Sequence, residues 1–98
     1  MCKIKTHAFD SSEQLDTSEA QAEYLAAAFE DGDPEFVKHA IGVVARARGM
    51  TQIAKDAGLG RESLYKALRE GGNPEFGTVL RVIRALGLKL TVEPERAA

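Results

Sequence analysis

The sequence lacks a second cysteine, a long hydrophobic run and a signal peptide. Cys2 is the single cysteine among 98 residues, so no disulfide forms within the chain and nothing indicates secretion. No segment approaches the ~18 apolar residues of a membrane span. The first ten residues, MCKIKTHAFD, contain no apolar run of the kind that a signal peptide needs. We therefore expect a cytoplasmic protein with no membrane partner.

Spaced sets of catalytic or metal-ligating residues are also missing. His7 and His39 are isolated in the sequence, and neither has a neighbour at the spacing of a metal site. Cys2 has no evident activating base. Gly58 and Gly60 are explained by a turn and do not form a phosphate-binding loop. We predict that the protein is not an enzyme and that it uses no metal or cofactor.

The length and composition fit one modest domain. A chain of 98 residues with 44% hydrophobic residues can bury a single core without disulfides. We divide it into an acidic extension over residues 1–32, a helical domain with a terminal strand over residues 33–92, and a flexible tail over residues 93–98.

The formal net charge of −2 is the sum of two halves of opposite sign. Residues 1–35 contain two lysines against nine Asp and Glu, whereas residues 36–98 contain eleven Lys and Arg against six Asp and Glu. Such asymmetry is typical of a protein with one basic and one anionic partner. The alternative is that the acidic residues offset the dipoles of helix N-termini.

Capping residues and apolar spacing predict five helices. Thr17 or Ser18 starts a helix that runs to about residue 30, and Asp33 with Pro34 starts the next, which ends at Gly49. Thr51 caps a short helix to residue 57, followed by helices over residues 61–69 and 74–86. The spacing places two apolar stripes in the core: Phe36, Val37, Ala40, Ile41, Val44 and Ala45 in the second helix, and Phe76, Val79, Leu80, Ile83 and Leu86 in the last.

Residues 88–92, LKLTV, alternate strictly between apolar and polar side chains. This pattern predicts a half-buried strand, which is too short to be stable without a partner. Residues 3–8 could supply that partner, within the chain or across a dimer.

Residues 50–69, MTQIAKDAGLGRESLYKALR, have the spacing of a helix-turn-helix motif. Gly58 permits a tight turn, and Ala54 lets the two helices approach closely. Apolar side chains then face the core, and polar side chains lie outside. The alternative is a plain helical hairpin with a solvated charged face.

The predicted DNA-contacting residues are the polar residues of these two short helices: Thr51, Gln52, Arg61, Glu62, Ser63, Tyr65, Lys66 and Arg69. The N-terminal residues of a recognition helix reach base edges in the major groove. We expect Arg61 to bond guanine there and the next two residues to contact other bases. The remaining residues suit phosphates or the groove wall.

From residue 31 to residue 92 the sequence resembles the probable addiction module antidote proteins. The most specific pieces are ARARGMTQIAKDAGL, RESLYKAL, GNPEF and ALGLKL. The family comprises HigA-like helix-turn-helix antitoxins of small RelE/ParE-type toxins. The resemblance implies an all-α, λ-repressor-like domain of five helices. Gly60 departs from the family pattern, which has Ser or Thr as the cap of the recognition helix.

The resemblance implies two binding activities. The antitoxin would neutralise its toxin and would repress its own operon by binding double-stranded operator DNA as a homodimer. Because such toxins are basic, we expect the acidic residues Glu19, Glu23, Glu30 and Asp31 to form the toxin-binding surface. The last helix and residues 88–92 are candidates for the dimer interface.

Two other functions remain open at the level of sequence. One is a stand-alone transcriptional regulator of the phage-repressor type with no toxin. The other is a protein-interaction module whose helix-turn-helix does not read DNA.

Overall fold

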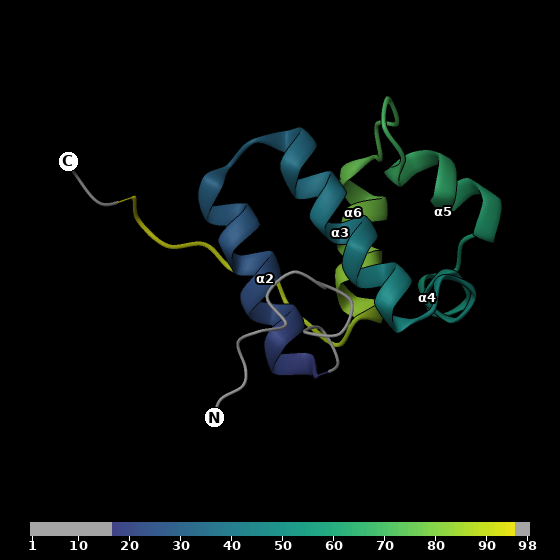
Figure 1. Ribbon diagram of the computed structural model, residues 1–98, viewed down its shortest axis with the longest axis horizontal. Helices are drawn as coiled ribbons and strands as arrows, with labels where there is room; N and C mark the ends of the chain where they lie inside the picture. The colour runs from purple at the N-terminus through teal and green to yellow at the C-terminus, as the bar shows by residue number, and fades with distance from the viewer. Residues whose placement is uncertain (1–16, 96–98) are drawn as a thin grey trace, which may run out of the picture.

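A computed structural model describes residues 17–95, and this part of the chain is all-helical (Figure 1). The elements in order are α2 (Ser18–Asp31), α3 (Pro34–Arg48), α4 (Met50–Ala57), α5 (Arg61–Leu68) and α6 (Phe76–Ala85). The expected class and the five expected helices are confirmed. No helix within the described range is long and apolar enough to cross a membrane.

Local capping explains the boundary between α2 and α3. The Thr17 hydroxyl accepts a hydrogen bond from the Ala20 amide at 3.1 Å, which identifies Thr17 as the cap of α2. Gly32 ends the helix with a φ of 82°, a conformation that favours glycine. The Asp33 carboxylate accepts from the Phe36 amide at 2.9 Å, and Pro34 occupies the first turn of α3. Each such cap stabilises a helix by about 1 kcal/mol. The cap at Asp33 and the position of Pro34 confirm the predicted start of the second helix.

One core joins all five helices. α3 lies between α2 on one side and α4 and α5 on the other, and α6 packs against α4 (Figure 1). The largest fully buried side chains come from three helices, α3, α5 and α6, and from the residue that follows α6: Ile41, Val44, Leu64, Val82 and Leu86. α2 adds Leu25 and Ala28, and α4 adds Ile53 and Ala54. Their periodic spacing in the sequence is what directs them to one interior.

Long basic side chains tie distant segments together. The Lys38 ammonium on α3 donates to the Gly72 carbonyl at 2.7 Å, in the loop between α5 and α6. The Arg48 guanidinium, at the end of α3, donates to the Leu86 carbonyl at 2.8 Å, at the end of α6. These bonds connect α3 to the loop that precedes α6 and to the residue that follows α6.

Two helix starts differ from the prediction. α4 begins at Met50 and its N-cap is Gly49, so Thr51 lies inside the helix and does not cap it. Gly49 has a φ of 113° and alone separates α3 from α4, which leaves no room for a separate capping turn. α6 begins at Phe76 after the N-cap Glu75, two residues later than expected from Pro74.

Two aromatic residues expected in the core lie outside it. Phe36 is 43% exposed and Phe76 is 69% exposed. Both occupy the first turn of their helices. Each lies on the apolar side of its helix, but the core does not extend that far along the axis. The apolar stripe of α6 instead includes Val82, which is fully buried.

The strand expected at residues 88–92 is not formed. Nowhere in residues 17–95 does the chain form a strand, and residues 88–93 run in an extended path along α2. A strand requires backbone hydrogen bonds to a neighbour, and its expected partner, residues 3–8, lies outside the described residues. Of the predicted tail, residues 93–95 are exposed and residues 96–98 lie outside the described range.

Candidate nucleic-acid interface

The two short helices α4 and α5 are joined by three residues. α4 ends at Gly58, which has a φ of 73°, and the Leu59 amide donates back to the Ala54 carbonyl at 2.8 Å. Gly60 then caps α5 in an extended conformation, with a φ of −73° and no side-chain hydrogen bond. The left-handed conformation at Gly58 turns the chain sharply and lets α5 leave α4 in a new direction.

The inner faces of α4 and α5 are apolar. Ile53, Ala54 and Ala57 of α4 are almost completely buried, as are Leu64 and Leu68 of α5. Because these residues recur three or four positions apart, each helix buries one side and presents the other to solvent. The outer side of α5 is therefore fixed in place by its buried leucines.

All eight predicted DNA-contacting residues are exposed. They are Thr51, Gln52, Arg61, Glu62, Ser63, Tyr65, Lys66 and Arg69. Five of them line one open hollow on the outer side of α5: Glu62, Ser63, Tyr65, Lys66 and Arg69. Thr51 and Gln52 do not line it, because they lie in the first turn of α4.

Arg61 and Tyr65 interact on the surface of α5. The Arg61 guanidinium carbon lies 5.2 Å from the centroid of the Tyr65 ring, at the spacing of one helical turn. Such a cation–π contact at an exposed site contributes about 0.5–1 kcal/mol. It holds the guanidinium against the ring, while the planar group retains N–H donors along its edge.

Gln52 has a hydrogen-bond partner that the sequence analysis did not identify. Its amide nitrogen donates to the Asp56 carboxylate at 2.8 Å, one turn further along α4. A primary amide has two N–H donors, so the second remains for another acceptor. The spacing of four residues within a helix is the signal that indicates this pair.

Arg81 is a basic residue near this surface that the sequence analysis missed. It projects from α6 toward the end of α4, and its guanidinium lies 3.5 Å from the Ala57 carbonyl oxygen and close to Gly58. A cation at a helix C-terminus is stabilised by the helix dipole. The 24 residues that separate Arg81 from Ala57 leave no local sequence signal for this contact.

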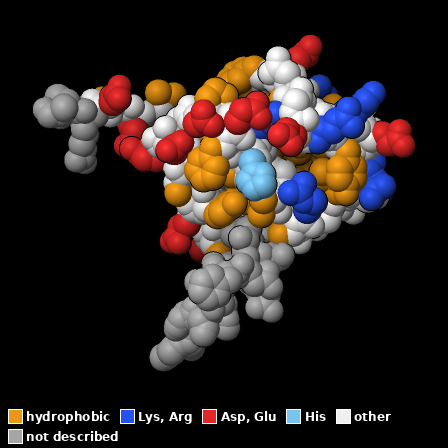
Figure 2. Space-filling view, turned by 45° about the horizontal axis from the view of Figure 1, so that its top comes forward, with side chains coloured by type: hydrophobic (Ala, Val, Ile, Leu, Met, Phe, Trp, Pro, Cys, Tyr) orange, Lys and Arg blue, Asp and Glu red, His pale blue; other side chains and the backbone are white. Residues whose placement is uncertain are grey.

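Acidic and basic side chains are unevenly distributed over the molecule. α2 contains no Lys or Arg, and its four predicted toxin-binding residues, Glu19, Glu23, Glu30 and Asp31, are all exposed. Figure 2 shows Lys and Arg side chains gathered at one end of the molecule, with some Asp and Glu side chains among them, and mainly acidic charged side chains over the rest of this face. Potentials of opposite sign at two ends favour partners of opposite charge.

Acidic residues are numerous, but they do not gather into a metal site. Across residues 17–95, no group of three His, Cys, Asp or Glu side chains is placed to hold a metal ion.

Comparison with known proteins identifies a relative that matches over nearly the full length. An uncharacterized protein of Haemophilus influenzae is 46% identical over 90 residues, which cover 92% of this chain and 93% of the relative. No solved structure matches the chain. The model of the family described as "Probable addiction module antidote protein" matches residues 5–94. The chain therefore belongs to the probable addiction module antidote protein family.

Proposed function

We propose that this chain is the antitoxin of a type II toxin–antitoxin module. It neutralises a RelE/ParE-like toxin and represses its own operon by binding operator DNA as a dimer. The observation that carries the proposal is the exposed polar side of α5, which is backed by the buried Leu64 and Leu68, in a chain of the antidote family.

In the DNA-binding part, α4 and α5 act as a helix-turn-helix within a λ-repressor-like domain. α5 enters the major groove with its N-terminal end toward the bases. Arg61, oriented by the Tyr65 ring, presents a guanidinium edge to guanine. Glu62 and Ser63 contact adjacent bases, and Lys66 and Arg69 contact phosphates.

The first turn of α4 supplies a second phosphate contact. Thr51 and Gln52 lie there, where amide groups and the helix dipole attract an anion. Gln52 uses its second N–H donor for the phosphate, because the first is bonded to Asp56.

Dimerisation follows from the size of the reading helix. α5 has eight residues, so it is about 12 Å long and spans only a few base pairs. Two copies related by a two-fold axis read two half-sites about one helical turn apart. A dimer therefore doubles the number of bases that are read.

The toxin-binding part uses the acidic surface of α2. Glu19, Glu23, Glu30 and Asp31 are exposed there, and they complement the positive charge of a basic toxin. α2 and α5 lie on opposite sides of α3 (Figure 1). Toxin and DNA can therefore be bound at the same time.

Two experiments test these two parts. A gel shift with DNA from upstream of the gene should show binding that weakens with added salt, and the absence of such binding would contradict the DNA-binding part. Co-expression with the product of the adjacent gene should suppress its toxicity. Continued toxicity despite co-expression would favour the stand-alone regulator, which the family match argues against.

The acidic surface is tested by charge reversal. Glu19→Lys with Glu23→Lys keeps α2 intact, whereas deletion of residues 1–32 would remove Leu25 and Ala28 from the core. Reversal should slow association with the toxin and make it less dependent on salt. Glu70→Lys, an exposed change between α5 and α6, serves as the matched control.

A further inference from the structure

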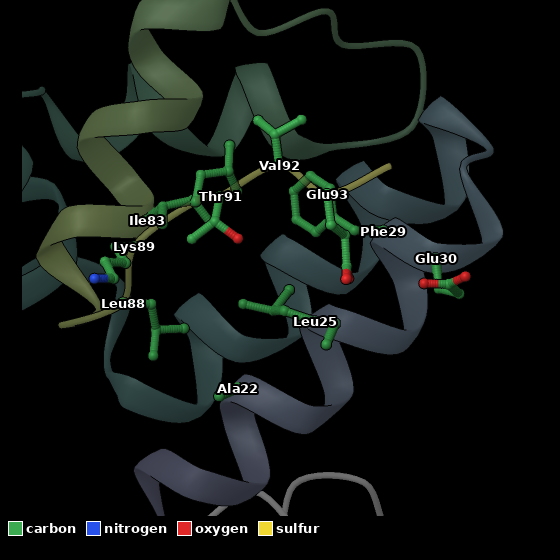
Figure 3. A pocket seen from close by; sticks show the side chains of 12 residues that line it. Ala22, Leu25, Phe29, Glu30, Ile83, Leu88, Lys89, Thr91, Val92 and Glu93 are labelled. Atoms are coloured by element: carbon green, nitrogen blue, oxygen red, sulfur yellow. The ribbon is translucent and has the colours of Figure 1, made fainter. Parts of the chain in front are cut away.

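α2 and the chain after α6 enclose an apolar groove of about 520 Å³. Leu25 and Phe29 line it from α2, and Leu88, Leu90 and Val92 line it from the extended segment. In Figure 3, Leu25 and Phe29 project from α2 toward the segment that carries Leu88 and Thr91, whereas Val92 projects away from the groove. Its volume is within the range of about 300–1,000 Å³ typical of ligand-binding clefts.

Three of the apolar side chains that line this groove are exposed to solvent. Phe29 and Leu90 are each 37% exposed, and Val92 is 94% exposed. They make up half of the large exposed hydrophobic side chains in residues 17–95. Contiguous apolar surface of this kind marks an interaction site, whereas scattered apolar residues do not.

Within residues 17–95, the backbone along one wall of the groove also lacks hydrogen-bond partners. The Leu88 amide donates to the Ile83 carbonyl at 3.1 Å, but residues 89–95 make no backbone hydrogen bond within the described part of the chain. An extended segment with unpaired amides and carbonyls is a template for a strand from another chain. The alternation of residues 88–92, which predicted a strand, suits such pairing.

The rim of the groove is predominantly acidic. Glu30 and Glu93 line the groove, and both also line an adjoining hollow with Glu95. Lys89 contributes one positive charge. If a second copy of this chain occupied the groove about a two-fold axis, the carboxylates of the two rims would be brought together, and like charges at an interface are unfavourable. A basic occupant would instead pair with these carboxylates.

We propose that this groove binds an extended segment of the basic toxin. An apolar side chain of the toxin segment occupies the space between Phe29 and Leu90. Lys or Arg side chains on either side of that apolar residue pair with Glu30 and Glu93. The backbone of the toxin segment pairs with residues 89–93. The proposal rests on the proposed function, to which it adds the location of the toxin contact and the chemistry of the segment that is bound.

Hydrogen–deuterium exchange of the full chain tests the pairing. The probe is the protein encoded by the adjacent gene. In the free chain, the amides of residues 89–93 should exchange almost as fast as those of an unfolded peptide, because they have no acceptor within residues 17–95. In the complex their exchange should slow by about tenfold or more, which corresponds to about 1.4 kcal/mol.

Substitutions in the groove test the apolar contact. Leu90→Asp should weaken binding of the probe by about 30-fold, the effect of losing a central anchor worth about 2 kcal/mol. Val92→Asp should act in the same direction, and its 94% exposure makes it harmless to folding. The matched control is Phe76→Asp, which changes an exposed apolar residue outside the groove and should leave binding unchanged. All three variants should bind upstream DNA as the unmodified chain does.

The outcomes separate the two proposals. If the unmodified chain does not bind the probe, both the toxin partner and the groove are overturned. If it binds but Leu90→Asp and Val92→Asp bind equally well, the groove alone is overturned. Slow exchange of the amides of residues 89–93 in the free chain would also overturn it. If this protection depended on protein concentration, the occupant would be a second copy of the chain. If it did not, the occupant would be residues 3–8.

Discussion

Lys38→Met is expected to destabilise the protein by removing a buried ammonium group. The Lys38 side chain is only 7% exposed, although lysine is rarely buried unless it is paired. Its ammonium donates to the Gly72 carbonyl at 2.7 Å and lies 2.9 Å from the Glu35 carboxylate. Methionine keeps the apolar stem of lysine but removes the charge and the donors.

The two contacts of Lys38 differ in strength. Glu35 is 69% exposed, so this ion pair is screened by water and contributes about 0–1 kcal/mol. The hydrogen bond to Gly72 is charge-assisted and partly buried, and such bonds contribute about 1.5–3 kcal/mol. We therefore expect Lys38→Met to cost about 1.5–3 kcal/mol. Glu35→Gln should cost less than about 1 kcal/mol.

Thermal unfolding followed by circular dichroism measures both changes. In a domain of this size, 1 kcal/mol corresponds to a shift of about 4–8 °C in Tm, so the effect of Lys38→Met is readily detected. Equal losses for the two variants would refute the reasoning, because the ion pair would then be the main contact. A loss below about 0.5 kcal/mol for Lys38→Met would show that the bond to Gly72 adds no stability.

Two further predictions concern glycines. Gly72→Ala should destabilise by about 1–3 kcal/mol, because the new Cβ would lie against the Lys66 and Ala67 carbonyl oxygens, 2.5 Å from the latter; a Tm equal to that of the unmodified chain would contradict this close approach. Gly60→Ser should stabilise α5 by a few tenths of a kcal/mol, because position 60 already has the extended conformation of a cap and lacks a capping side chain. Comparing the Tm of Gly60→Ser with that of Gly60→Ala, which lacks the hydroxyl, isolates the contribution of the capping hydrogen bond. An equal rise in Tm for the two variants would argue against a capping role for the serine hydroxyl.

The sequence predicted the features that depend on neighbouring residues. The restart at Asp33 and Pro34 is local chemistry, and it occurs as predicted. The turn at Gly58 is likewise set by one residue with a positive φ. The exposure of Arg61 and Lys66 follows from the periodic burial of Leu64 and Leu68.

Features that depend on tertiary packing were mispredicted or missed. Periodicity indicates which side of a helix is apolar, but it does not show where the core ends, so Phe36 and Phe76 were placed inside it. α6 starts after a loop whose Gly72 carbonyl accepts a hydrogen bond from Lys38. These two residues are 34 positions apart, so no local sequence signal indicates the contact. The approach of Arg81 to the end of α4 is also long-range.

The most direct test of the central claim is the binding of Arg61→Ala and Lys66→Ala to upstream and random DNA over a range of salt concentrations. Fluorescence anisotropy gives each Kd. If α5 reads DNA as proposed, Arg61→Ala should lose about 1–3 kcal/mol on the specific site and much less on random DNA, whereas Lys66→Ala should weaken both alike and lower the salt slope by about one. Equal losses of Arg61→Ala on both DNAs would remove Arg61 from base recognition. Unchanged binding by both variants would contradict the assignment of α5 as the reading helix.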